Sequence, residues 1–411
     1  MAESEAIDGV VPRSVVEPAT IEEVAAAIRD AAERDLAVVP RGLGGHLDVG
    51  GPPRRADMLL SMRSVSRIVD HQAADMTVRV EAGCPLSRLA STLAGAGQWL
   101  PLDPPGSEAT TVGGLLATNL AGPLRASQGT ARDLLIGLTV VAHDGALVSG
   151  GGRVVKNVAG YDMPKMHVGA LGTLGVIVEA TFKVRPRPAL EAAIAMACAS
   201  PEEAGDLALA LRDACEPLWL EIVGPDPAGS SGDLGFGESW SVVAGAGGVT
   251  EEVRDALARY AETGGARVLE TEVPEAAELR ARIADRTLHP LGATIRAATL
   301  PTRVGAFLGK LSRSAATRGV SCRVHAHAAN GVVRARLDGG ESLGALVADV
   351  RAEVENEGGN LVVERAPPGV KRTLAAWPGI WGDPGPGLGL MKRIKSTFDP
   401  ADRLSPGRFV C

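Results

Sequence analysis

The sequence is poor in aromatic residues and in cysteine, and it lacks the patterns of several protein classes. Only 3% of its 411 residues are aromatic, and its five cysteines are scattered without any C-x-x-C spacing. This excludes an iron–sulfur or zinc site built from cysteines alone and suits a reducing compartment. No apolar run reaches the roughly 18 residues of a membrane span, and the first residues show no signal-peptide pattern. We therefore expect a cytoplasmic protein without a membrane span, any membrane association being made through partner subunits.

Positive charge is scarce as well. Lys and Arg number 42 against 49 Asp and Glu, which gives a formal net charge of −7. No run of Lys or Arg is long enough to follow a phosphate backbone. Nucleic acid is therefore not expected as a partner.

Glycine, in contrast, is abundant, with 51 residues that gather in the first half of the chain. The loop Pro40 to Gly51 follows an expected strand, and its successive backbone N–H groups can form a nest for a pyrophosphate. A plain glycine-rich turn explains the same loop. The nicotinamide-binding pattern G-x-G-x-x-G fails because Leu47 stands at its third glycine, and no G-x-x-x-x-G-K-[ST] loop occurs.

Two further glycine-rich stretches follow. Leu100 to Pro123 places Gly113 and Gly114 at the start of a small-residue helix, where free N–H groups can face an anion or a flat ring. Close helix packing through small residues is the alternative. The third stretch, Gly151 to Val184, ends in G-T-L-G-V-I at the start of a strand. Three such loops in one region favour a bound cofactor over simple turns.

The order of expected helices and strands predicts an α+β protein. After Arg185 to Pro188 the order strand, helix, strand, strand, helix, strand occurs twice, over Ala192 to Glu270 and Ala293 to Glu364. Each repeat has the order of a split β-α-β, or ferredoxin-like, unit. The expected parts are a glycine-loop domain (residues 1–188), a cap domain of two such units (189–366) and a C-terminal segment that returns to the first domain (367–411).

A β-hairpin is expected around the Asn330–Gly331 pair, the dipeptide most typical of a tight hairpin turn. With a two-residue turn, His327 faces Arg334 and His325 faces Arg336, all on one side of the sheet. Such a face can hold a substrate carboxylate, because Arg offers a fork of donors and His a switchable donor. A solvent-exposed sheet face explains the same charges.

Three runs in the first half and one at the end carry a family resemblance. They are T-V-G-G-L-L-A-T-N from Thr111, K-N-V-A-G-Y-D from Lys156, G-A-L-G-T-L-G-V-I-V-E-A-T from Gly169, and D-P-A-D-R-L-S-P-G-R from Asp399. Together they resemble the vanillyl-alcohol-oxidase family, whose FAD-binding domain is of the PCMH type. Within that family the likeness is to the FAD-binding subunits of bacterial glycolate oxidases. The resemblance implies a PCMH-type FAD-binding domain followed by the cap domain.

The resemblance also implies which residues hold FAD. The first phosphate loop corresponds to Arg41, Gly42, Leu43, Gly44, Gly45 and His46, the second to Thr111, Val112, Gly113, Gly114, Asn119 and Gly122 together with Pro104, and the strand-opening loop to Gly172, Gly175 and Ile177, with Lys156 and Asn157 nearby. Some relatives tether FAD covalently through a His of the first loop. The corresponding position here is Gly45, and His46 stands one residue later, so we expect non-covalent FAD.

Related 2-hydroxy-acid dehydrogenases carry metal-ligand histidines in a G-H-x-G-D-G-N-x-H-like motif and a later E-H-G-I-G motif. This chain has A-H-A-A-N-G-V-V-R, with Arg334 at the second His, and E-R-A-P-P-G, with Arg365 at the other. We therefore expect no metal site. An arginine cannot accept a proton at neutral pH, which leaves His325, His327 and Glu364 as candidate catalytic bases beside Arg334.

Hydride transfer from a small 2-hydroxy acid such as glycolate to FAD is the activity that the resemblance implies. The chain is then expected to be the FAD-binding subunit of a complex with a second flavoprotein subunit and an iron–sulfur subunit. Two alternatives stay open. One is a self-sufficient FAD-dependent oxidoreductase for another small hydroxy acid or alcohol, and the other is a flavin-binding assembly subunit without catalysis of its own.

Overall fold

The chain folds into two compact units, each assembled from separate stretches of the sequence. The computed structural model describes residues 6–152, 162–226, 234, 236–273, 275–288, 291–374 and 379–410. The first unit combines Met1–Leu120, Gly129–Arg187 and Pro384–Cys411, and the second combines Ala121–Gln128 and Pro188–Asp383. The junction after Arg187 lies within Arg185 to Pro188, next to the expected boundary at residue 188, whereas the returning C-terminal portion begins at Pro384 and not at residue 367.

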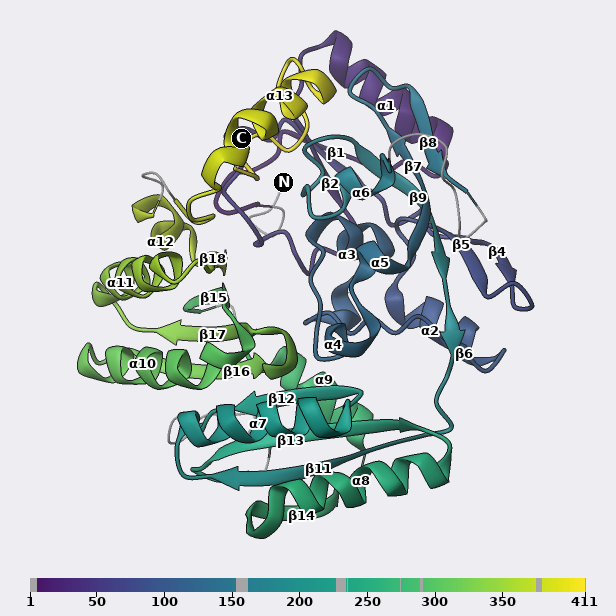
Figure 1. The fold of residues 1–411 in the computed structure, drawn as a ribbon. Helices are drawn as coiled ribbons and strands as arrows, with labels where there is room; N and C mark the ends of the chain where they lie inside the picture. Colours follow the sequence, from purple (N-terminus) through teal and green to yellow (C-terminus); the bar gives the residue numbers. More distant parts are fainter. Residues whose placement is uncertain are drawn as a thin grey trace. The chain divides into compact units, whose positions relative to one another are not determined.

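A small parallel sheet opens the first unit (Figure 1). Its strands, in the order β1-β3-β2, are β1 (Ser14–Val16), β3 (Met58–Ser61) and β2 (Val38–Arg41). Helix α1 (Ile21–Glu33) packs Val24 and Ile28 against this sheet. Its N-terminus is capped by the Thr20 hydroxyl, which accepts a hydrogen bond of 3.2 Å from the N–H of Glu23. Strand β2 ends directly at the glycine-rich loop.

A five-stranded antiparallel sheet forms the larger part of the first unit. In the order β4-β5-β9-β7-β8, its strands are β4 (Ile68–Gln72), β5 (Thr77–Glu81), β9 (Val176–Lys183), β7 (Leu135–Val141) and β8 (Leu147–Gly151), and β6 (Gln98–Trp99) pairs separately with β10 (Arg185–Pro186). The helices of this unit besides α1 are α2 (Leu86–Ala94), α3 (Val112–Thr118), α5 (Ala131–Leu134), α6 (Pro164–His167) and α13 (Leu388–Phe398). Helix α3 buries Val112 and Leu116 in the same core as Val80 and Phe182 of the sheet, which fixes its position.

The second unit is built on one eight-stranded sheet in the order β14-β11-β13-β12-β16-β17-β15-β18. Its first half contains β11 (Leu190–Cys198), α7 (Pro201–Cys215), β12 (Trp219–Val223), β13 (Trp240–Gly248), α8 (Thr250–Gly264) and β14 (Val268–Val273). Its second half contains β15 (Ala293–Ala298), α10 (Val304–Thr317), β16 (Ser321–His327), β17 (Val332–Asp338), α11 (Ser342–Asn356) and β18 (Asn360–Arg365). In each half the first strand lies between the third and the fourth, as in a ferredoxin-like unit. Pairing of β12 with β16 joins the halves into one sheet.

The two faces of this sheet carry different side chains. One face packs against α7, α8, α10 and α11 and forms an apolar core that includes Ile222, Val324 and Val333. Side chains alternate along a strand, so the neighbours Glu221 and His325 belong to the opposite face. The segment Ala121–Gln128, which contains α4 (Arg125–Gln128), belongs to the same unit and contacts β12. The remaining helices of this unit are α9 (Ala276–Asp285) and α12 (Pro368–Thr373).

The hairpin forms where the Asn330–Gly331 pair predicts it, but its register differs from the expected one. A 3-10 turn over Ala328–Asn330 lengthens the connection, so His327 pairs with Val332 and His325 with Arg334. The expected pairing of His327 with Arg334 is therefore wrong by two residues. A two-residue shift keeps every side chain on its own face, because side chains alternate along a strand. The polar residues consequently still share one face.

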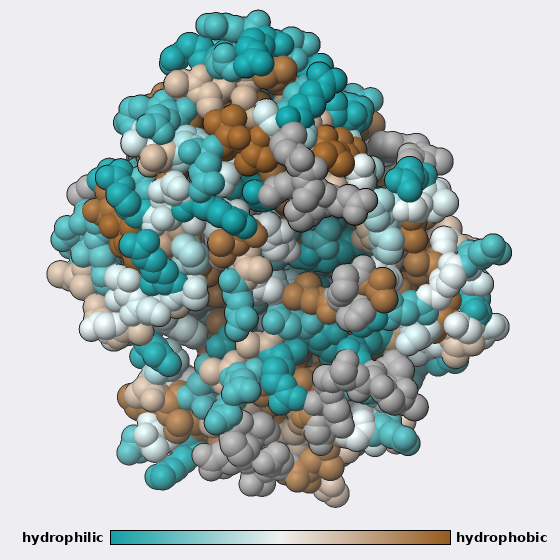
Figure 2. Space-filling view, turned by 180° about the vertical axis from the view of Figure 1, so that it is seen from behind, coloured by the Kyte–Doolittle hydropathy of each residue, from teal (hydrophilic) through white to brown (hydrophobic). Residues whose placement is uncertain are grey.

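Apolar side chains on the surface are dispersed. In the view of Figure 2, hydrophobic residues lie in small groups between hydrophilic ones. Among the described residues, Leu291 and Leu300 are the most exposed large apolar ones, at 66% and 62%. Isolated exposures of this kind are ordinary on protein surfaces. Among the described residues, no helix is both long and apolar enough to cross a membrane.

Candidate functional site

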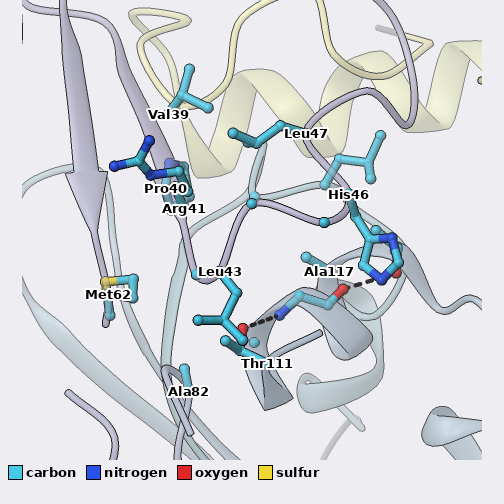
Figure 3. A pocket seen from close by; sticks show the side chains of 18 of the residues that line it. Val39, Pro40, Arg41, Leu43, His46, Leu47, Met62, Ala82, Thr111 and Ala117 are labelled. Carbon is cyan, nitrogen blue, oxygen red and sulfur yellow. Dashed lines mark hydrogen bonds between the residues drawn. The ribbon is translucent and has the colours of Figure 1, made fainter. Parts of the chain in front are cut away.

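The glycine-rich loops of the first unit surround a cavity (Figure 3). Most of the residues expected to hold FAD line it: Arg41, Gly42, Leu43, Gly44, Gly45, His46, Thr111, Gly113, Gly114, Gly172 and Ile177. They come from the loop after β2, the start of α3, the turn before β9 and β9 itself. The structure thus brings the three glycine-rich stretches around one space.

The glycines of this cavity serve two different purposes. A Cβ on Gly42 would lie 2.3 Å from Thr111 Oγ1, and one on Gly45 would lie 2.6 Å from the carbonyl oxygen of Ala109. These two glycines are therefore required by packing. A Cβ on Gly114 would meet nothing closer than 3.4 Å, although this residue lines the cavity. Protein packing does not require glycine at this position, which suits close approach of a bound group to the backbone.

Backbone donors are available in the first loop but not at α3. The N–H of Gly113 donates to the carbonyl of Ala82 (2.7 Å), and that of Gly114 donates to Thr111 Oγ1 (3.2 Å). The expectation of free N–H groups at the start of α3 is therefore wrong, because a strand carbonyl and the Thr111 cap already satisfy them. In the described chain, the N–H groups of Gly42 and Leu43 make no hydrogen bond. Both residues line the same cavity and offer the donors that an anion needs.

Several residues expected at the cofactor lie outside the cavity lining. Pro104 and Gly175 are not part of the lining, Val112 is buried in the core, and Asn119 forms the left-handed C-cap of α3 with φ of 49°. Gly122 belongs to the second unit. Lys156 and Asn157 lie outside the described residues. A linear motif cannot separate residues that face a ligand from neighbours that face the core.

The C-terminal residues contribute to the lining in a way that the sequence analysis missed. Ser405 and Arg408 both face the cavity. The buried guanidinium of Arg408 donates to the carbonyl oxygens of Gly51 (3.1 Å) and Val49 (2.6 Å), and so holds the end of the glycine-rich loop. Burial lowers the pKa of Arg408, and Asp8 at 3.3 Å opposes this effect. The P-G-R ending of the chain was the available signal.

His46 is held within the protein. Its Nε2 lies 2.6 Å from the Thr110 hydroxyl, which itself donates to the carbonyl of Gly106 at 2.7 Å. The hydroxyl proton is thereby used, so Nε2 of His46 donates to Thr110. A ring nitrogen bound in this way is a poor attachment point, which favours non-covalent FAD.

A second group of candidate residues lies on the polar face of the eight-stranded sheet. Glu221 of β12 lies between two histidines of β16, with Oε2 3.1 Å from Nδ1 of His325 and Oε1 2.7 Å from Nδ1 of His327. All three side chains are fully buried. Sequence analysis missed Glu221. Its signal was one acidic residue inside the apolar strand L-W-L-E-I-V, a position where burial requires a partner.

Arg334 extends this cluster along β17. Its guanidinium donates to both carboxylate oxygens of Glu364 (3.1 and 3.3 Å), to the carbonyl of Ala121 (2.6 Å) and to Nε2 of His327 (3.2 Å). Arg296 also lies 3.1 Å from Glu364. Burial raises the pKa of the Glu364 carboxyl, but Arg334 and Arg296 outweigh burial and hold that pKa below its usual value. Glu364 is therefore ionised.

Because these residues are buried, the interpretation of their sheet face as solvent-exposed is wrong. Arg334 is 1% exposed, and His325 and His327 are 0% exposed. Burial, followed by the charges of Arg334 and Arg286, holds the pKa of His325 well below its usual value. Burial, followed by His325 and Arg334, does the same for the pKa of His327. Both imidazoles are neutral at pH 7.

Hydrogen bonding also fixes the tautomer of each histidine. Arg334 carries only donors, so Nε2 of His327 accepts, and its proton sits on Nδ1 and is donated to Glu221. His325 likewise donates from Nδ1 to Glu221, since a carboxylate only accepts. Among the described residues, Nε2 of His325 has no hydrogen-bond partner. The lone pair at this nitrogen is unused.

Glu221, His325 and His327 also have the spacing of a metal site. Their ligand atoms lie within 4.8 Å of one another. A metal on Nδ1 of His327 would move the ring proton to Nε2, directly opposite the Arg334 donor, and would add a second cation beside the first. The donor set therefore does not suit a divalent ion.

Comparison with known proteins finds similarities to part of the first unit. Residues 12–151 match the family model described as FAD binding domain. The chain is 35% identical over 176 residues to the glycolate oxidase subunit GlcE of Escherichia coli. The aligned region covers 40% of this chain and 50% of the relative. It is also 31% identical over 177 residues to the glycolate oxidase subunit GlcD of Bacillus subtilis, and this aligned region covers 43% of this chain and 38% of the relative. The match thus spans half or less of the length of these relatives.

Two other similarities cover nearly the whole chain. A D-lactate dehydrogenase of Archaeoglobus fulgidus is 27% identical over 420 residues, which cover 96% of this chain and 91% of the relative. The solved structure of an alkyldihydroxyacetonephosphate synthase superposes with a TM-score of 0.68 at 18% identity, covering 96% of this chain and 77% of the other. The structural similarity supports the fold alone.

Proposed function

We propose that this chain is an FAD-dependent oxidoreductase acting on the CH–OH group of a small 2-hydroxy acid such as glycolate. Residues 12–151 match the model described as FAD binding domain, which supports the cofactor. The observation that carries the proposal is the cavity formed by the three glycine-rich stretches, in which Gly114 leaves room that protein packing does not require. The names of the relatives, glycolate oxidase subunits and a D-lactate dehydrogenase, supply the substrate class.

In this proposal the first loop and α3 hold the cofactor without a covalent bond. The N–H groups of Gly42 and Leu43 serve its phosphates, and the backbone at Gly114 allows close approach. FAD, when bound, accepts a hydride. The protein supplies the position of the cofactor, a site for the substrate carboxylate and a proton acceptor.

The substrate carboxylate is proposed to bind near Arg296. Two guanidinium groups, those of Arg296 and Arg334, share the single carboxylate of Glu364. Arg334 is fully enclosed, whereas the side chain of Arg296 is 30% exposed. An exposed guanidinium that already shares its counter-ion retains donors for a second carboxylate.

The proton acceptor is proposed to be His325. Of the three candidate bases, Glu364 is held as an ionised partner of arginines, and Nε2 of His327 already accepts from Arg334. His325 is neutral and has an unused lone pair on Nε2, while Glu221 holds its opposite nitrogen in the donor state. A neutral imidazole with a free lone pair, oriented by a carboxylate, can accept a proton from a substrate hydroxyl.

The proposed assembly is a complex with a second flavoprotein subunit and an iron–sulfur subunit. The word subunit in the names of two relatives supports an assembly of several chains. A self-sufficient enzyme is the second candidate. It is favoured by the D-lactate dehydrogenase whose similarity covers 96% of this chain.

The test is anaerobic single-turnover reduction of the purified flavoprotein by glycolate and by D-lactate. We expect acid-released FAD, slow or no bleaching of the flavin bands alone, and fast bleaching when the partner subunits are added. Bleaching within seconds without partners would instead establish the self-sufficient enzyme. If the protein binds no FAD, both the complex subunit and the self-sufficient enzyme are rejected. If it binds FAD but the flavin is not reduced in any assembly, the assembly-subunit alternative remains.

A further inference from the structure

Ser405 stands out among the residues that line the cofactor cavity. Its side chain is 1% exposed, its Oγ makes no hydrogen bond in the described part of the chain, and its backbone φ is 45°. Left-handed backbone at a residue other than glycine is strained and persists only where the surroundings impose it. A buried hydroxyl without a partner is a further cost.

A rigid frame imposes this conformation. The N–H of Ser405 donates to the carbonyl of Val38 in β2 (2.9 Å), and its carbonyl accepts from the N–H of Arg408 (3.1 Å). Just before it, the N–H of Leu404 donates to Asp399 Oδ2 (2.7 Å), and the Leu404 carbonyl accepts from Lys395 Nζ (3.1 Å). The backbone at Ser405 is thus bound on both sides.

The same frame brings Ser405 against the glycine loop that opens β9. Lys395 Nζ, paired with Asp399, also donates to the carbonyl of Thr173 (3.0 Å). A Cβ on Gly172, which has φ of 73°, would lie 3.3 Å from Ser405 Oγ. Gly172 and Ser405 both line the cavity that also contains Gly114. The unpaired hydroxyl of Ser405 therefore lies at the wall of the cofactor cavity.

From this geometry we propose that Ser405 is a cofactor-binding residue whose Oγ hydrogen-bonds a polar group of FAD. The site of this contact lies in the C-terminal segment, outside residues 12–151 that match the FAD-binding domain. The bound cofactor satisfies the hydroxyl that the protein leaves unpaired, which accounts for a strained serine at this position. The proposal rests on the FAD assignment and adds the C-terminal segment to the binding site.

The test compares Ser405→Gly, Ser405→Ala and Ser241→Ala. Glycine adopts φ of 45° without strain, so Ser405→Gly removes the hydroxyl while relieving the backbone. Ser241 is the matched control, since it is 0% exposed, its Oγ has no partner among the described residues, and it lies in the second unit. The apo-protein of each variant is titrated with FAD by flavin fluorescence quenching, and its thermal unfolding is recorded without FAD.

We expect both Ser405 variants to bind FAD roughly three- to tenfold more weakly than the wild type, as for loss of one hydrogen bond. Ser405→Gly should unfold at the same temperature as the wild type or higher, and Ser241→Ala should bind FAD normally. Wild-type affinity in both Ser405 variants would overturn the proposal, and so would an equal loss in Ser241→Ala. If the wild type binds no FAD, the cofactor assignment itself fails, a result distinct from failure of the Ser405 contact alone.

Discussion

Nη1 of Arg334 lies 3.2 Å from Nε2 of His327, with both side chains almost completely buried. A permanent cation thus donates to a buried ring nitrogen. The contact fixes the proton of His327 on Nδ1, toward Glu221, and leaves Nε2 of His325 as the unused acceptor of the cluster. Arg334 therefore contributes a positive charge to this cluster and determines which ring nitrogen of His327 carries the proton.

Arg334→Ala should lower the free energy of unfolding by about 3–5 kcal/mol, because it leaves the buried Glu364 without its main partner. Lys310→Ala is the control, since the Lys310 side chain is 54% exposed and loss of its ion pair with Glu353 should cost about 1 kcal/mol or less. Urea unfolding of both variants provides the measurement. Equal losses would show that the Arg334 cluster is no more important than a surface ion pair.

Gly114→Asp should abolish FAD binding while leaving the fold intact. A Cβ here would meet no protein atom closer than 3.4 Å, and Gly114 lines the cavity, so we expect the Asp side chain to place a negative charge where the cofactor binds. Gly340→Asp is the matched control, because Gly340 has nothing within 4 Å and lies in the second unit. Flavin absorbance of the purified variants and their circular dichroism measure the two effects. Normal flavin content in Gly114→Asp would contradict the assignment of this cavity.

His325→Gln should reduce the rate of flavin reduction by a 2-hydroxy acid by about 10²- to 10⁴-fold, the usual contribution of a general base. Glu221→Gln should also slow reduction, because an amide no longer holds both Nδ1 protons. Stopped-flow measurements in the active assembly test this, with His71→Gln in the first unit as the control. An unchanged rate in His325→Gln, with FAD still bound, would move the base elsewhere.

His167 makes the stability of the first unit depend on pH. Burial lowers the pKa of His167 from its ordinary value of 6.5 to about 4. Between these values the unfolded chain binds more protons than the folded one, so stability is complete above pH 6.5 and falls as the pH decreases toward 4. The loss is about 3 kcal/mol. Urea unfolding at about pH 7 and about pH 4.5 should show a smaller pH effect in His167→Gln than in the wild type, and parallel curves would disprove the assignment.

Local sequence patterns were enough to predict the architecture. Strand and helix periodicity gave the order of the second unit twice over, and the Asn330–Gly331 pair located its central hairpin. The predicted register of that hairpin was wrong by two residues, because the length of a turn depends on the packing around it. The three glycine-rich stretches indicated the cofactor region, but the reason for individual glycines did not follow from the sequence, since Gly42 and Gly45 are required by contacts with Thr111 and Ala109.

The tertiary structure alone decided which residues meet. Glu221 lies 104 residues before His325, and Ser405 lies far along the chain from Gly172, so no spacing in the sequence relates them. The sequence determined the helices and strands, the glycine loops and the presence of Arg334 and Arg365. Burial and strand pairing determined that Glu221 orients two neutral histidines and that the Ser405 hydroxyl faces the cofactor cavity, because desolvation and hydrogen-bond partners exist only once distant segments have packed together.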